Sequence, residues 1–128
     1  MNQPIVEMFL EMLNTIKLYH WKTTSYSQHK ATDELHENVS KHTDKFVEIM
    51  MGKLPSDVDR NRVTYNGNNI PIYDFKDKES FIQKLNQYIV NLQDFSNRFD
   101  NKIDSDLLNI RDEIMGDINQ TLYLFTLE

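Results

Sequence analysis

One stretch of the chain places six polar or metal-binding side chains on one face of a predicted helix. These residues, called the stripe below, are His29, Asp33, Glu37, Ser40, Asp44 and Glu48. At about 100° per residue they fall within an arc of roughly 100°, because eleven residues make almost a whole number of helical turns. Imidazole and carboxylate groups are donors that bind hard or borderline metal ions. The stripe therefore predicts a metal site.

A second interpretation of the stripe is the solvated face of an amphipathic helix. The apolar face of the same segment comprises Leu35, Val39, Phe46 and Met50. The centre of the stripe lies about 150° from that face, where amphipathic helices carry solvated charge. Against this, the lysines of the segment lie outside the stripe, which lacks the Glu–Lys pairing typical of a solvated face. Both interpretations remain open at this stage.

His20 is a further candidate ligand. It falls on the apolar face of the preceding helix, one turn from its end, where a core histidine bonded to a neighbour is the alternative. His36 borders the stripe and His42 lies off it, and we expect both to be solvated. Asp112 and Asp117 are expected to be surface charges.

Composition excludes several chemistries. The chain has 128 residues, no cysteine and a formal net charge of -6, so we expect one domain over residues 1–128 and no thiolate or disulfide chemistry. Acidic and basic residues are interspersed and no basic tail is present, so nucleic acid is not an expected partner. The amino terminus lacks the charged start and apolar run of a signal peptide, and no segment suggests a membrane span.

Apolar spacing predicts an all-α protein of four helices. They cover residues 4–21 and 27–51, then begin near residues 77 and 104, where Asp77 and Asp104 are acceptable N-caps. The apolar face of the third helix runs from Phe81 through Ile89 to Phe99. Short connections make each pair an antiparallel hairpin. About 25 residues, 52–76, connect the pairs and are enough to return along the bundle. We therefore expect a ferritin-like four-helix bundle with one long crossover, carrying a small β-hairpin of residues 63–65 and 70–73.

The stripe of one chain cannot form one site. The His29/Asp33 pair and the Asp44/Glu48 pair are about 16 Å apart along a helix, and the chain has no E-x-x-H motif of a conventional di-metal bundle. An antiparallel two-fold partner would place Asp44 and Glu48 of one chain beside His29 and Asp33 of the other. We therefore expect a homodimer or a larger shell.

These residues resemble the Dps-type mini-ferritins, a branch of the ferritin superfamily. The Tyr19-His20-Trp21 string is similar to the Y-H-W at the end of that family's first helix. The spacing of His29, Asp33, Asp44 and Glu48 is similar to that of its ferroxidase ligands, which two subunits share. The resemblance implies iron, Fe2+ and Fe3+, or another divalent metal, with His20 as an additional ligand.

The last helix adds to the resemblance. Glu113 and Ile114, followed by Ile118 and by Leu122-Tyr123, resemble the family's last helix, where a tryptophan usually stands in place of Tyr123. The lysine-rich arm that some members use for DNA is missing.

The resemblance implies a ferroxidase-type oxidoreductase that oxidises ferrous iron with peroxide or dioxygen, sequesters it and limits oxidative damage. The chain also resembles short uncharacterised ferritin-like proteins of large DNA viruses. The alternative function is therefore that of a metal-free interaction protein for assembly, or a virion-associated bundle, which has kept the fold and lost the iron chemistry. A cytoplasmic or other intracellular location, including a virion, is expected.

Overall fold

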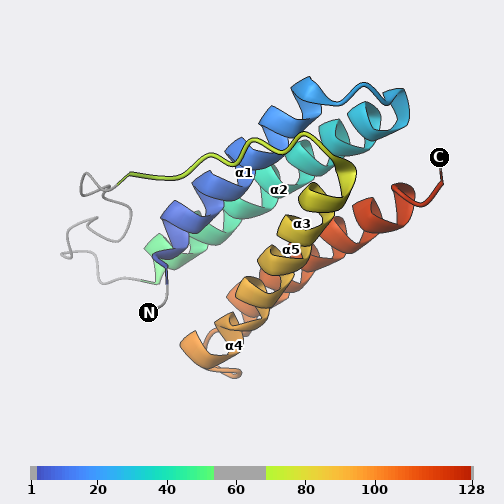
Figure 1. Ribbon diagram of the computed structural model, residues 1–128. Helices are drawn as coiled ribbons and strands as arrows, with labels where there is room; N and C mark the ends of the chain where they lie inside the picture. The colour runs from blue at the N-terminus through green and yellow to red at the C-terminus, as the bar shows by residue number, and fades with distance from the viewer. Residues whose placement is uncertain (1–2, 54–68, 128) are drawn as a thin grey trace.

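The computed structural model describes residues 3–53 and 69–127, and the described part is helical (Figure 1). The helices are α1 (Ile5–Lys22), α2 (Tyr26–Gly52), α3 (Lys78–Gln93), the one-turn α4 (Phe95–Arg98) and α5 (Ser105–Leu124). Within these ranges no strand is present. The all-α class is confirmed, with four long helices as expected.

α1 and α2 form an antiparallel hairpin with a turn of three residues. α1 ends because Thr23 has an extended backbone, and its N–H donates to the carbonyl of Tyr19. α2 begins at the N-cap Ser25, whose hydroxyl accepts from the N–H of Gln28. The Tyr19 hydroxyl donates to Oε1 of Gln28 at 2.6 Å. These contacts fix the end of α1 against the start of α2.

α3 is shorter than the sequence predicts. Asp77 is its N-cap and accepts from the N–H of Ser80 at 2.9 Å, as expected. The helix breaks at Asp94 rather than continuing to residue 99. The break is stabilised from α5, because the buried Arg111 guanidinium donates to the carbonyl of Leu92 at 2.9 Å. This contact comes from a side chain 19 residues away, which helical periodicity alone could not reveal.

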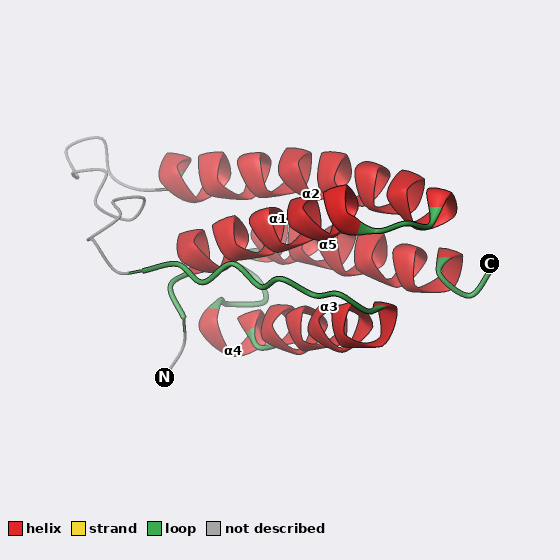
Figure 2. Ribbon diagram, turned by 45° about the horizontal axis from the view of Figure 1, so that its top comes forward, coloured by secondary structure: helices red, strands yellow, loops and turns green. Residues whose placement is uncertain are grey.

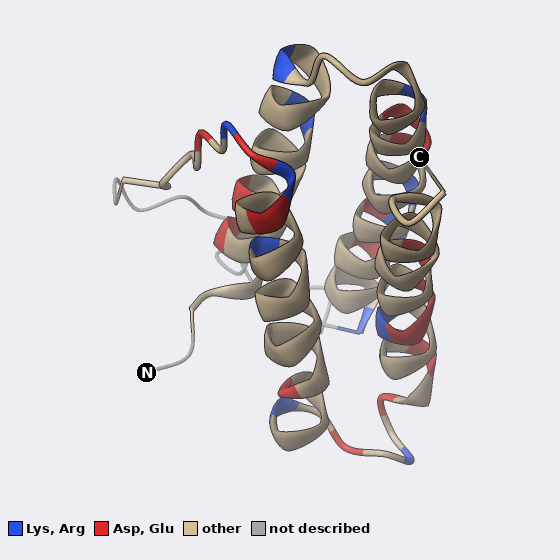
Figure 3. Cartoon of the chain, turned by 45° about the vertical axis from the view of Figure 1, so that its right-hand side comes forward, with Lys and Arg blue, Asp and Glu red and all other residues tan. Residues whose placement is uncertain are grey.

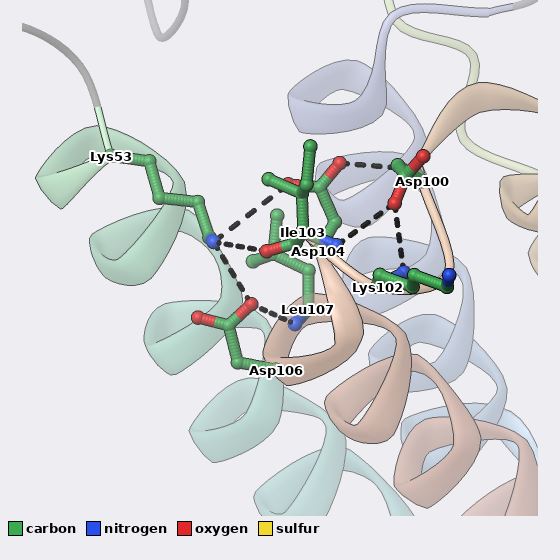
Figure 4. Close-up of polar contacts among 7 residues, drawn as sticks. All are labelled: Lys53, Asp100, Lys102, Ile103, Asp104, Asp106 and Leu107. Atoms are coloured by element: carbon green, nitrogen blue, oxygen red, sulfur yellow. Dashed lines mark hydrogen bonds and ion pairs between the residues drawn. The ribbon is translucent and has the colours of Figure 1, made fainter.

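The connection into α5 is built by carboxylates (Figure 4). Oδ1 of Asp100 accepts from the N–H groups of Lys102 and Ile103. The N-cap position of Asp104 is as predicted, but its side chain makes no cap hydrogen bond and instead accepts from the N–H of Asp100. Lys53, directly after α2, pairs with Asp106 at 3.1 Å. This contact joins the end of α2 to the start of α5.

The contacts at the two ends of the bundle establish a long crossover between α2 and α3. Lys53 places the end of α2 beside the start of α5. At the other end Tyr19 stacks on Phe81 with ring centroids 4.0 Å apart, and Phe125 packs against both rings. α3 therefore begins at the end of the bundle where α2 begins (Figure 1), as the length of the connection predicts.

Residues 69–77, the described part of this crossover, lie against α1 and α3 (Figure 2). Asp74 pairs with Lys22 of α1 at 2.6 Å, and the Lys84 ammonium of α3 lies 3.9 Å from the ring centroid of Tyr73. The strand predicted at residues 70–73 is wrong, because this segment packs by side chains and has no regular secondary structure. Its expected partner, residues 63–65, lies outside the described residues.

A polar group lies within the apolar core. The core comprises aromatic and aliphatic side chains from every helix, among them Phe9, Phe46 and Phe95 in mutual contact. The buried Tyr88 hydroxyl donates to Glu11 at 2.8 Å, and Lys84 lies 3.5 Å from the same carboxylate oxygen. These contacts join α1 to α3. Helical periodicity does not reveal these contacts between Tyr88, Glu11 and Lys84.

Candidate metal centre

The stripe lies on the outer face of α2. His29, Asp33, Glu37, Asp44 and Glu48 are exposed, and Ser40 is half-buried. The prediction that the stripe faces away from the core of the chain is confirmed. The ion pairs that lysine and arginine form between described residues involve other carboxylates, which agrees with the predicted lack of Glu–Lys pairing.

His20 and His29 are held together by reciprocal hydrogen bonds. Nδ1 of His20 lies 2.8 Å from the carbonyl oxygen of His29, and Nδ1 of His29 lies 2.9 Å from the carbonyl oxygen of His20. The two rings stack with centroids 3.9 Å apart and planes 17° from parallel. Residues nine apart in sequence thus form one compact unit across the α1–α2 turn.

These contacts assign the neutral tautomer of both rings. A backbone carbonyl can only accept a hydrogen bond, so Nδ1 of each ring must carry a proton and donate it. In the neutral imidazole the other nitrogen, Nε2, then carries the lone pair. Metal-binding histidines commonly have this arrangement, in which one N–H donates to a carbonyl and fixes the direction of the ligating nitrogen.

Asp33 lies beside the histidine pair. Its Oδ1 is 3.9 Å from Nε2 of His20, and the side chains of His20 and Asp33 are 8% and 67% exposed. The separation is too long for a hydrogen bond. It suits two ligands of one ion, since ligands about 2.1 Å from a metal can lie up to about 4.2 Å apart. His20 is therefore a buried, hydrogen-bonded histidine with Nε2 directed toward the stripe.

The two halves of the stripe remain apart within the chain. His29 and Asp33 lie near the start of α2 and Asp44 and Glu48 near its end, about 16 Å away at 1.5 Å per residue. Over the described ranges, no group of three or more His, Asp or Glu side chains is placed to hold an ion. The structure thus brings His20 to His29 and Asp33, but not to Asp44 or Glu48.

His42 makes contacts that the sequence analysis did not predict. Its Nδ1 lies 2.7 Å from Asp117 and its Nε2 lies 2.8 Å from Glu113, so it joins α2 to α5. Burial raises the pKa of Asp117 above its usual value, and the bond and charge of His42 oppose this rise. The expectation that His42 and Asp117 are solvated is wrong. Only the i,i+4 spacing of Glu113 and Asp117 could have indicated the contact.

His36 is half-buried rather than fully solvated. Burial lowers its pKa below the usual value, the charges of Lys17 and His20 lower it further, and Asp33 opposes them. It lies three residues after Asp33 on α2, one turn nearer the middle of the helix. Among the described residues, no hydrogen bond or ion pair joins His36 to the histidine pair, so His36 lies outside the candidate site.

Charge is distributed over the whole bundle. Basic and acidic residues are interspersed along the helices (Figure 3), in agreement with their mixing in the sequence. Among the described helices, none is long and apolar enough to cross a membrane.

The chain belongs to DUF5856, a family of unknown function whose model matches residues 20–125. The matched region begins at His20 and includes the whole stripe. No curated protein and no solved structure matches the chain.

Proposed function

We propose that this DUF5856 protein is a ferritin-like bundle that binds ferrous iron and oxidises it at sites shared by two copies. His20, His29 and Asp33 of one chain would form one side of each site. Asp44 and Glu48 of the second chain would form the other side. A second copy of the chain, rather than nucleic acid, is the proposed partner.

The reciprocal bonds of His20 and His29 are the observation that carries this proposal. In the neutral form of both rings they leave the lone pair on Nε2, and Nε2 of His20 lies 3.9 Å from Asp33. A histidine that served only the core would need no second histidine with the same tautomer beside an exposed carboxylate. Fixed ring orientation is also what a metal site requires of its ligands.

The donor types suit iron in both oxidation states. Imidazole nitrogen is a good ligand for ferrous ion, whereas carboxylates are hard anionic donors that favour the ferric product. Two ferrous ions each lose one electron, and with two protons these electrons reduce one peroxide to two molecules of water. Dioxygen is the alternative oxidant. The protein would thereby remove both reactants of radical-forming chemistry.

The shared site requires an antiparallel two-fold pairing of α2. Such a pairing would bring the exposed carboxylates near the end of one α2 to the histidine pair near the start of the other, and would do so twice per dimer. The long crossover and the two helical hairpins agree with a ferritin-like connectivity.

The test is a double substitution, Asp44→Ala with Glu48→Ala. Both side chains are exposed, so we expect the circular dichroism spectrum to be unchanged. We expect ferrous oxidation to be lost, as measured by the absorbance of the ferric product. Glu34→Ala with Glu79→Ala is the matched control, because it removes two exposed carboxylates outside the stripe. The control should retain the wild-type rate.

Equal rates in the wild type and the stripe variant would contradict the proposal. Wild-type protein that is purified without chelator, contains no metal and does not oxidise ferrous ion would favour the metal-free assembly function instead.

A further inference from the structure

Thr32 is a buried hydroxyl beside the histidine pair. It is fully buried on α2, and its Oγ1 lies 3.1 Å from Nδ1 of His20. The same oxygen lies 2.8 Å from the carbonyl of Gln28 and 3.2 Å from that of His29. Nδ1 of His20 therefore has two oxygen neighbours, the hydroxyl of Thr32 and the carbonyl of His29.

A count of protons gives the direction of each bond. The Thr32 hydroxyl has one proton, and its nearest acceptor is the carbonyl of Gln28. Toward His20 the hydroxyl therefore presents lone pairs. The Nδ1 proton of His20 is shared between the carbonyl of His29 and the hydroxyl of Thr32. If the proton were on Nε2 instead, the lone pairs of Nδ1, the His29 carbonyl and the Thr32 hydroxyl would face one another.

We propose that Thr32 is a positioning residue, which keeps the proton of His20 on Nδ1 and so keeps Nε2 free to bind metal. This inference rests on the proposed metal centre for its purpose, but the tautomer is a property of the metal-free chain. Without the hydroxyl, one of the two oxygens that disfavour the other tautomer is lost. His29 serves as the internal comparison: its Nδ1 lies 2.9 Å from the carbonyl of His20, and the hydroxyl of Thr32 contacts the backbone carbonyl of His29 rather than its ring.

The experiment compares wild type with Thr32→Val, Thr32→Ala and Thr32→Ser by nitrogen NMR of the histidine rings. The full, metal-free chain is studied at about pH 8.5, where histidine is ordinarily neutral. We expect wild-type His20 to show a protonated Nδ1 and an unprotonated Nε2. Thr32→Val and Thr32→Ala should move the Nδ1 shift of His20 toward the unprotonated value, with a much smaller change at His29. Thr32→Ser should restore the wild-type spectrum.

Thr43→Val is the matched control. Thr43 is buried on the same helix, eleven residues later and so in nearly the same direction, and its hydroxyl donates to the carbonyl of Ser40. The Thr43→Val substitution removes a comparable hydroxyl that is distant from the histidine pair, so His20 should keep its wild-type shifts. A change that reflects only lost core packing would appear in this control as well.

Metal titration is the second measurement. Substitution of residues that support metal ligands typically lowers metal affinity by about 10–100-fold. Thr32→Val should therefore bind ferrous ion about tenfold more weakly than wild type, whereas Thr43→Val should bind it as tightly as wild type. Unchanged His20 shifts in both hydroxyl-free variants, or an Nε2-protonated His20 in wild type, would overturn the inference. If the shifts behave as expected but wild type binds no ferrous ion, the positioning is correct and the proposed function fails.

Discussion

Complementation between two inactive variants tests the shared site most directly. One subunit carries His29→Ala with Asp33→Ala, and the other carries Asp44→Ala with Glu48→Ala. If the proposal holds, each variant alone should form dimers with two damaged sites. In a mixed dimer with antiparallel α2 helices, the intact carboxylates of the first chain meet the intact His29 and Asp33 of the second. The other site of that dimer collects all four losses.

The expected magnitude follows from this counting. Random pairing of equal amounts makes about half of the dimers mixed, and each mixed dimer has one restored site of two, so the mixture should recover about one quarter of the wild-type oxidation rate. A larger shell gives the same fraction, because the count applies to each two-fold interface.

The assay is ferrous oxidation after co-refolding, with one subunit isotopically labelled so that native mass spectrometry counts mixed dimers. Each variant refolded alone provides the baseline. No recovery in a sample with the statistical share of mixed dimers would refute the antiparallel sharing of ligands. Recovery that follows the mixed fraction as the input ratio changes would support it.

Two further predictions concern the scaffold. Tyr88→Phe removes the donor to the buried Glu11 and should lower the free energy of unfolding by about 1–3 kcal/mol in equilibrium denaturation, whereas Tyr123→Phe, at an exposed position, should change it little. Asp77→Ala should lower the melting temperature at neutral pH, because it removes the N-cap of α3. Hydrogen bonds from the N–H and hydroxyl of Ser80 lower the pKa of Asp77 below 3.8, so the stabilisation is complete above that pH and disappears as the pH falls through the lowered pKa. A difference that persists at low pH would contradict this reasoning.

The sequence predicts local elements well because their causes are local. The four long helices, the N-cap at Asp77 and the exposed face of α2 follow from spacing and from residues within one turn. The break of α3 is different, since it depends on Arg111, which is 19 residues from the carbonyl that it contacts. The conformation of residues 69–77 likewise depends on contacts with Lys22 and Lys84 rather than on the apolar pattern that predicted a strand.

Burial on α3 shows a further limit of periodicity. The apolar pattern selects Ile89 for the core, but Ile89 is only half-buried and its neighbour Tyr88 is fully buried. Tyr88 lies on the same face as the buried Phe81, Leu85 and Leu92, and its hydroxyl donates to Glu11 and Thr15 of α1. A polar partner on another helix thus satisfies the hydroxyl of a tyrosine that the choice of Ile89 overlooks.

The candidate site was predictable only where its residues lie on one helix. Spacing along one helix places the stripe, but the approach of His20 to His29 depends on the turn between α1 and α2. Its three residues align the two rings so that each donates to the carbonyl beside the other. The exposure of Asp44 and Glu48 was predictable. Within the described part of the chain, no other element brings His, Asp or Glu side chains close enough to complete a metal site with them.

Under the proposed function, the two interpretations of the stripe would apply to different stages of assembly. In the single chain Asp33, Asp44 and Glu48 are exposed, so their charges keep their hydration and do not oppose folding. Bringing two such faces together without a cation would place carboxylates near one another at a cost, which a divalent ion offsets. His20 and His29 differ, because their reciprocal bonds form on folding. An oriented pair of imidazoles and a hydrated set of carboxylates would therefore meet only on dimerisation, and a face that is solvated in one chain could be a metal interface in two.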